Sequence, residues 1–141
     1  MKGDRPEWPA QYALGAKVAT LIEQWCEHHG LPAEGSPQLG YRAVVVDNVR
    51  VRLGELQSGA LVVESQFAPL PLADRDRDLM VERALRLSYK RVRSSRVRCV
   101  TDLEAAALWL QIVLPGSVSE EQLSLAVEDL VNEVERWRKV F

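Results

Sequence analysis

Hydrophobic positions between residues 72 and 98 form the pattern from which the rest of the chain is interpreted. Alternating Asp and Arg residues at 74–78 open a predicted helix over about 75–91. At about 100° per residue, the hydrophobic side chains of 80–89 spread over roughly 200° of that helix, and Leu79 lies further round. A surface helix needs a stripe of only about 100°. We therefore expect the helix to bury one side against its own sheet and another, beside the strand-like run 91–98, in a homodimer. The residues expected in that interface are Met80, Ala84, Leu87, Arg91 and Val97.

Two further helices are predicted, one toward each end of the chain. The first runs from about Trp8 to His29 and ends before a glycine, with hydrophobic residues at +4, +3 and +4 spacing. The last begins at Ser119, which forms a capping box with Gln122. Its hydrophobic positions up to Phe141 keep strict +4, +3 spacing, which is typical of a helix packed on a core.

Five strands are predicted from alternation or β-branched content, with short turns that make the first three antiparallel neighbours. Residues 31–37 read as a loop because of their Pro, Gly and Ser content. A turn is expected at 102–104, although 101–104 also resembles a helical capping box. The predicted strands are 42–47, 49–53, 61–67, 96–100 and about 106–114.

The resulting order α-β-β-β-α-β-β-α predicts an α+β fold, an antiparallel sheet flanked by helices. We expect residues 1–141 to form a single domain with a loose tail at 1–7. Hydrophobic residues make up 47% and charged residues 27% of the sequence, so the chain is able to bury a core.

The net charge and the lengths of the hydrophobic segments limit the cellular locations and the binding partners that we expect for this protein. A net charge of −2 gives no overall attraction to nucleic acid or to an anionic membrane. The beginning of the chain lacks the hydrophobic region of a signal peptide, and the longest apolar run, 105–114, is half the length of a membrane span. Two cysteines far apart in the sequence are expected to remain reduced thiols. We therefore expect a cytoplasmic protein that does not associate with membranes.

Catalytic motifs are missing from the sequence, so no enzymatic activity and no cofactor are expected. Cys26, His28 and His29 lie together, but a zinc site needs further Cys or His ligands, and a solvated helix end is the preferred interpretation. The alternate aspartates of 74–78 lack the glycine and the distal glutamate of a calcium loop. Acidic residues at a helix start are favoured by the helix dipole instead.

One stretch of the chain is strongly basic. It is the best candidate for a nucleic-acid surface, but its single aromatic residue is too few for base stacking. Alternate arginines also protect the outer face of an edge strand from aggregation, and they pair with acidic residues of a protein partner. We do not expect nucleic acid to be the main partner. The basic residues are Arg86, Lys90, Arg91, Arg93, Arg96 and Arg98.

Three features together carry a resemblance to a known family. They are a leading helix before a β-meander, a proline-bearing loop before the second helix, and a proline-ended strand before the periodic last helix. These features lie at 30–31 with Asp47, at 67–71 leading into 79–87, and at 113–115 leading into 123–137. From about Leu14 to Trp137 the chain resembles the class I chaperones of bacterial type III secretion, the Tir-chaperone-like family.

The resemblance implies a homodimer that binds an extended segment near the N-terminus of a secreted virulence effector. Such a chaperone keeps the segment competent for secretion and delivers it to the secretion machinery without hydrolysing ATP. Two alternatives remain: a regulator with the chaperone fold that binds another protein, and a nucleic-acid-binding regulator that uses 91–98. Val18, expected to be partly exposed, is the preferred residue for a binding test. Effector contacts are expected at Leu14, Val18, Leu21, Val44, Val46 and Val62.

Overall fold

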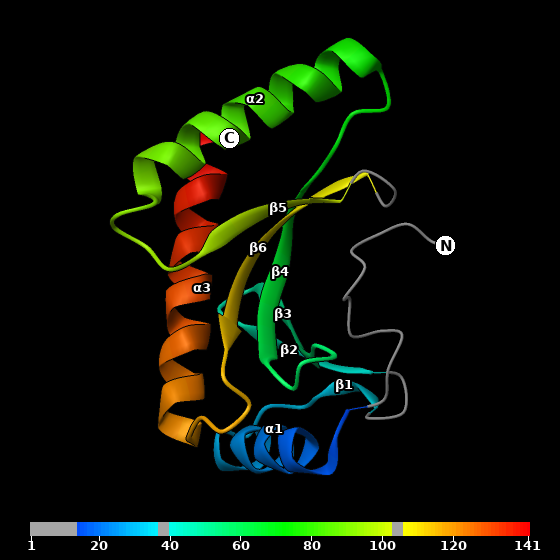
Figure 1. Cartoon of the computed structure of the whole chain (residues 1–141), viewed down its shortest axis with the longest axis vertical. Coiled ribbons are helices and arrows are strands. Elements are labelled where there is room, and N and C mark those ends of the chain that lie inside the picture. Colours follow the sequence, from blue (N-terminus) through cyan, green and yellow to red (C-terminus); the bar gives the residue numbers. More distant parts are fainter. Residues whose placement is uncertain (1–13, 37–39, 103–105) are drawn as a thin grey trace.

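In the part of the chain that the structure describes, six antiparallel strands form one sheet, and three helices lie around it (Figure 1). The computed structural model describes residues 14–36, 40–102 and 106–141. The strand order is β1-β2-β3-β4-β6-β5, and the predicted α+β class is confirmed. The elements are α1 (Ala16–His28), β1 (Glu34–Ser36), β2 (Tyr41–Val46), β3 (Val49–Glu55), β4 (Leu61–Pro69), α2 (Asp74–Arg91), β5 (Arg98–Asp102), β6 (Ala107–Leu114) and α3 (Glu120–Val140).

Alternation along β3 divides the two faces of the sheet. Val49, Val51 and Leu53 are fully buried in the core, as predicted, whereas the arginines between them point to the other face. A two-residue turn joins β2 to β3, with φ angles of 51° at Asp47 and 65° at Asn48. Asp and Asn tolerate this left-handed conformation, which two-residue hairpins of the right twist require. The turn therefore fixes the register of the hairpin and the position of Asp47.

Helix α3 supplies the largest contribution to the core. Its predicted stripe is buried against β3, β4 and β6, and the Trp137 ring meets that of Phe67 edge-on, with centroids 5.1 Å apart. Ser119 accepts a hydrogen bond from the backbone N–H of Gln122, and the Gln122 side chain accepts one from the Ser119 backbone. The predicted capping box and stripe are both confirmed.

Helices α1 and α2 lie at opposite ends of the molecule (Figure 1). Helix α1 packs at the beginning of α3, where the Trp25 indole N–H donates to the Ser124 hydroxyl across 2.7 Å. Helix α2 packs near β5 and the end of α3, where Arg83 donates to the carbonyl of Val140 across 3.2 Å. Surfaces built on α1 and on α2 are therefore far apart.

Several boundaries differ from those predicted, and β3, β4 and β5 each end two residues later than expected. Leu14 and Gly15 precede α1 rather than lying inside it, because the backbone N–H of Gly15 is held by the Glu55 carboxylate, 2.7 Å away; residues 8–13 fall outside the described part. The predicted loop 31–37 contains β1, which pairs with β2. Its Glu-Gly-Ser sequence has no strand pattern, so the partner strand determines its conformation.

The sequence allowed either a helix or a turn followed by a strand after residue 101, and the structure has the strand that we expected. Asp102 ends β5 and Ala107 begins β6, so the alternative helix is wrong for the residues described, while 103–105 lie outside them. Hydrophobic residues of β6 alternate between the core and the other face. None of the described helices is both long and apolar enough to cross a membrane.

Candidate functional site

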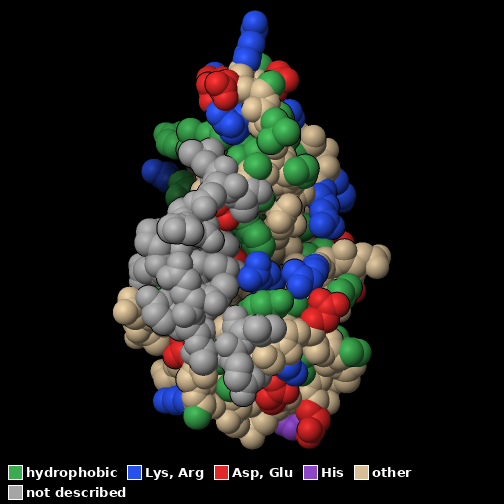
Figure 2. Space-filling view, turned by 90° about the vertical axis from the view of Figure 1, so that its right-hand side faces the viewer, with side chains coloured by type: hydrophobic (Ala, Val, Ile, Leu, Met, Phe, Trp, Pro, Cys, Tyr) green, Lys and Arg blue, Asp and Glu red, His purple; other side chains and the backbone are tan. Residues whose placement is uncertain are grey.

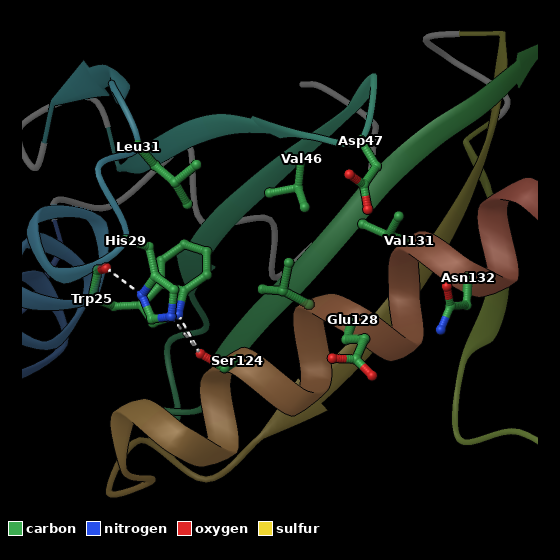
Figure 3. Close-up of a pocket in the computed structure, with 10 residues that line it drawn as sticks. Trp25, His29, Leu31, Val46, Asp47, Ser124, Glu128, Val131 and Asn132 are labelled. Atoms are coloured by element: carbon green, nitrogen blue, oxygen red, sulfur yellow. Dashed lines mark hydrogen bonds between the residues drawn. The ribbon is translucent and has the colours of Figure 1, made fainter.

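A pocket of about 320 Å³ opens between the end of α1, the β2–β3 turn and α3 (Figure 3). Leu31, Val46 and Asp47 lie on one side of it, and side chains of α3 lie on the other, with Trp25 and His29 closing one end. Its interior is mainly hydrophobic and its rim is polar. The lining residues are Trp25, His29, Leu31, Val46, Asp47, Ser124, Val127, Glu128, Val131 and Asn132.

Backbone geometry at the end of α1 places Leu31 in the pocket wall. The Gly30 N–H donates to the carbonyl of Glu27, and the Leu31 N–H donates to that of Cys26, 2.9 Å away. With Gly30 at φ 63°, these two bonds form a Schellman motif, which turns the residue after the glycine back onto the helix. Because Glu34 pairs with Ala43, continuing that register by three residues brings Leu31 beside Val46.

A chain of hydrogen bonds links the side chains at the α1 end of the pocket. The His29 Nδ1–H donates to the carbonyl of Trp25 across 2.9 Å, so in the neutral ring Nε2 is an acceptor. Ser124 accepts the indole N–H of Trp25 and directs its own hydroxyl hydrogen to His29 Nε2, 3.4 Å away. Every polar atom of this group is thereby used within the wall.

Two carboxylates lie on the rim without a compensating charge. Asp47 is held by the hairpin turn, and Glu128 projects from α3, with Asn132 one turn further on. Both carboxylates are exposed, and neither forms an ion pair with any described side chain. None of the described lining residues is a lysine or arginine. The pocket therefore presents a hydrophobic interior beneath a negatively charged rim.

The residues expected to contact an effector are only partly brought together. Val46 lines the pocket, and Leu21 is half-buried on α1. Leu14, Val18 and Val44 belong to the hydrophobic core, with exposed fractions of 7%, 2% and 1%. The expectation of a partly exposed Val18 is therefore wrong, because α1 packs this side chain into the core. Val62 is fully buried on the sheet face opposite to its core neighbour Val63.

Several pocket residues were not identified from the sequence. The sequence indicated Asp47 only through the family resemblance, and His29 only as a possible metal ligand. Ser124, Glu128 and Asn132 follow one another at +4 spacing beside the core stripe of α3. That spacing marks a ridge on the helix, but an ordinary solvent-facing row has the same pattern.

The histidines near the end of α1 have protein partners. His28 lies 2.7 Å from a carboxylate oxygen of Glu120, while Cys26 is buried, which raises the pKa of its thiol. Within residues 14–36, 40–102 and 106–141, no group of three or more His, Cys, Asp or Glu side chains is arranged to hold a metal ion.

A second surface of interest lies on the outer side of α2. Leu85 and Tyr89 are 66% and 82% exposed, and Val92 continues their line just after the helix. On the inner side Ala84 is buried, while Met80 and Leu87 pack half-buried against the core. The wide hydrophobic arc is therefore divided, with one half covered by the protein itself and the other half open. We call the residues Leu85, Tyr89 and Val92 the outer stripe.

The residues expected in a dimer interface lie mostly on the covered half. Ala84 and Val97 are 3% and 6% exposed. Arg91 forms two hydrogen bonds of 2.9 Å to the carboxylate of Glu133 on α3. Their part in a dimer stays a prediction, and in the single chain they join α2 to the core.

Glu133 forms the centre of a buried ionic group. Burial acts to raise the pKa of its carboxyl, but hydrogen bonds from Arg91 and Trp137 and the charges of Arg91 and Arg136 outweigh it and lower that pKa. The hydrogen bond to Glu133 in turn raises the pKa of Arg91.

The basic run is partly engaged inside the protein. Besides Arg91, Arg96 pairs with Asp129 of α3 across 2.9 Å, and Arg98 donates to the backbone carbonyls of Ser95 and Val97. Figure 2 shows the side of the molecule that faces away from the α2–β5 connection, and on its described part positive and negative side chains are interspersed. The arginines thus help attach the α2–β5 connection to α3, which leaves fewer of them for phosphate groups.

The chain matches a protein-family model and several solved structures. The model of the Tir chaperone protein (CesT) family matches residues 20–138, whereas no curated protein sequence matches significantly. Among the solved structures that match are three complexes with the same fold. The HopA1–SchA chaperone–effector complex has 13% identity and a TM-score of 0.68, covering 87% of this chain and 94% of that one.

The other two structures are also complexes. The Yersinia pestis type III secretion chaperone SycH, solved with a stable fragment of YscM2, has 22% identity and a TM-score of 0.58, covering 84% of this chain and 98% of that one. The ExsC–ExsE complex has 17% identity and a TM-score of 0.68, covering 91% and 96%. At these identities the likeness establishes the fold.

Proposed function

Because the chain belongs to the Tir chaperone protein (CesT) family, we propose that it is a homodimeric chaperone of bacterial type III secretion. Its client is an extended segment near the N-terminus of an effector, which it keeps competent for secretion and delivers to the secretion machinery from the cytoplasm. The family match carries this proposal. The neighbouring chaperone–effector complex and the SycH–YscM2 complex support it, because those proteins bind protein partners. The function requires no catalytic turnover.

The positions of the two open surfaces support simultaneous dimerisation and client binding. The pocket lies at the α1 end of the molecule and the outer stripe at the α2 end (Figure 1). A partner protomer on the stripe therefore leaves the pocket accessible, and a dimer presents the pocket twice. A client that becomes ordered only on binding needs a large contact area to offset its loss of conformational entropy.

The proposed dimer interface centres on the outer stripe and the neighbouring edge of β5. Exposed hydrophobic side chains that line up on one helix face are typical of an interaction surface. In the described part of the sheet, β5 pairs with β6 alone, so its other edge is available for a partner. Met80, Ala84, Leu87, Arg91 and Val97 would then support the interface from beneath.

Leu85→Glu tests the dimer. The side chain is 66% exposed in one protomer, so the variant should fold normally, yet in the dimer its charge would be buried without a partner. Light scattering should therefore report monomers with an unchanged circular dichroism spectrum. Leu125→Glu is the matched control, because Leu125 is 51% exposed on α3, away from the outer stripe. This variant should still show the mass of a dimer in light scattering. A dimeric Leu85→Glu protein would place the interface elsewhere.

Capture from the native host tests the client. The tagged chain should co-purify with a secreted protein, and limited proteolysis should leave one protected client fragment that begins near the N-terminus. Val46→Asp, which places a charge in the pocket wall, should weaken capture while the fold is kept. Protection of a folded internal domain, or capture of nucleic acid that falls steeply with salt, would contradict the proposal.

A further inference from the structure

We propose that the pocket selects an aliphatic side chain that has a lysine or arginine two residues away in an extended peptide. The inference rests on the proposed function for the origin of that peptide, and on the pocket itself for its chemistry. It names a sequence preference of the client.

The volume of the pocket limits which peptide groups fit inside it. About 320 Å³ lies at the low end of the roughly 300–1,000 Å³ range of ligand pockets. A helix about 10 Å across is too wide to enter it. The interior is bounded by Leu31, Val46, Val127, Val131 and the Trp25 ring, so an aliphatic side chain is the complementary group. A second copy of the chain is assigned to the outer stripe at the other end.

Charge on the rim determines what should lie beside the aliphatic residue. Asp47 and Glu128 have no cationic partner among the described residues, and no lysine or arginine lines the pocket. The other titratable lining group, His29, donates its Nδ1–H to a backbone carbonyl and faces Ser124 with Nε2. A peptide cation at the rim would therefore neutralise charge, whereas a peptide carboxylate would be repelled.

Strand geometry sets the spacing of the two residues. In an extended peptide, neighbouring side chains point to opposite sides, and side chains two positions apart share a side at about 6.6–6.8 Å. Lysine and arginine lay their hydrocarbon stems along apolar surface while the charged group reaches water. A cation two residues from the aliphatic side chain thus reaches the rim while its stem covers the pocket edge.

Short peptides test this preference without the natural client. The probes are the acetylated and amidated pentapeptides RSLSR, ESLSE and RSSSR, titrated into ¹⁵N-labelled full-length chain at low salt. RSLSR should shift the indole N–H signal of Trp25 and bind several-fold more tightly than ESLSE, with the difference shrinking at high salt. RSSSR, which lacks the aliphatic side chain, should give no shift at Trp25.

Two isosteric variants test whether the rim carboxylates cause the preference for a cationic peptide. Asp47→Asn keeps a residue that tolerates the left-handed turn, and Glu128→Gln keeps the shape of an exposed helix residue. Each should reduce the preference for RSLSR over ESLSE about two- to fivefold, the range expected for one exposed ion pair. Glu135→Gln is the control, because Glu135 is exposed on α3 but does not line the pocket, and it should change nothing.

The outcomes separate this inference from the proposed function. Equal binding of RSLSR and ESLSE, binding of RSSSR as tight as that of RSLSR, or shifts confined to another surface would overturn the preference. Failure to capture a client would overturn the proposed function, while the peptide result would still stand for the pocket. A captured client whose binding is unaffected by Asp47→Asn with Glu128→Gln would overturn the preference alone.

Discussion

Arg91→Met should destabilise the protein much more than removal of any exposed arginine of the same basic run. Arg91 reaches from α2 to Glu133 on α3 with two hydrogen bonds of 2.9 Å. The side chains of Arg91 and Glu133 are 22% and 5% exposed. Methionine keeps most of the hydrophobic stem, so the substitution removes mainly the charge and the two bonds.

The magnitude follows from the charge that is left behind. Breaking a buried ion pair costs about 3–5 kcal/mol. Glu133 keeps the indole N–H of Trp137 at 3.1 Å and Arg136 at 3.6 Å, and Arg91 is not fully buried. We therefore expect a loss of about 2–3 kcal/mol, or a fall in Tm of roughly 6–12 °C for a domain of this size.

Thermal and urea unfolding of three variants measure the effect. Arg96→Met is the control, because its pair with Asp129 is 45% and 52% exposed and should cost about 0–1 kcal/mol. Adding Glu133→Gln to Arg91→Met removes the unpaired charge while keeping an acceptor for Trp137. The double variant should therefore be more stable than Arg91→Met alone. Equal costs for the two arginines, or a double variant less stable than the single, would refute the reasoning.

Acid should reduce the difference between the wild-type protein and Arg91→Met. The pKa of Glu133 is lowered in the folded state, so the stability it contributes is complete above the ordinary glutamate pKa of about 4.3. That contribution is lost as the pH falls through the lower folded value. In Arg91→Met burial remains but the main lowering interaction is gone. The cost of the substitution should therefore be larger at pH 7 than near pH 4.

Three further substitutions or reactions have definite expected outcomes. Val18→Asp buries a charge in the core and should lower Tm or prevent folding, so retention of the wild-type Tm would contradict the burial of α1. Gly116→Ala places a Cβ against the carbonyl oxygen of Gly59 and should cost about 1–3 kcal/mol in urea unfolding. Burial raises the pKa of the Cys99 thiol to about 11, so Cys99 should react slowly with iodoacetamide at pH 8 in the native protein, and rapid alkylation would contradict its environment.

Local patterns were sufficient to predict much of the fold. The last helix was identified because Ser119 and Gln122 cap it and its hydrophobic spacing is strict. Alternation in the 49–53 segment correctly placed Val51 in the core. The three-residue strand Glu34–Ser36 was missed, because its pairing with β2 depends on residues outside it.

The candidate site was less predictable because exposure depends on tertiary packing. The hydrophobic stripe of α1 predicted one buried face, but not whether the protein's own core or a client covers it. In the structure its own core covers Val18 almost completely. The pocket rim combines Asp47 with Glu128, 81 residues later, and no local pattern links two such positions. Only the tertiary fold, which places the β2–β3 turn and α3 on two sides of the same pocket, brings them together at its rim.

The wide hydrophobic arc of α2 was interpreted correctly only in part. Its width correctly indicated a helix with more hydrophobic surface than one contact covers. The assignment of sides was less successful, since Ala84 faces the protein's own core while Leu85 and Tyr89 remain open. An amphipathic pattern gives the angles between residues, and the packed structure decides which direction faces inward.

Hydrogen–deuterium exchange of the whole chain, with and without the captured client segment, tests most directly whether separate ends serve dimerisation and client binding. Addition of the segment should slow exchange at the end of α1 and at the β2–β3 turn. Helix α2 should be protected equally in both states, and should lose that protection in Leu85→Glu. Slower exchange at α2 on client addition, with no change at the β2–β3 turn, would contradict this division of surfaces.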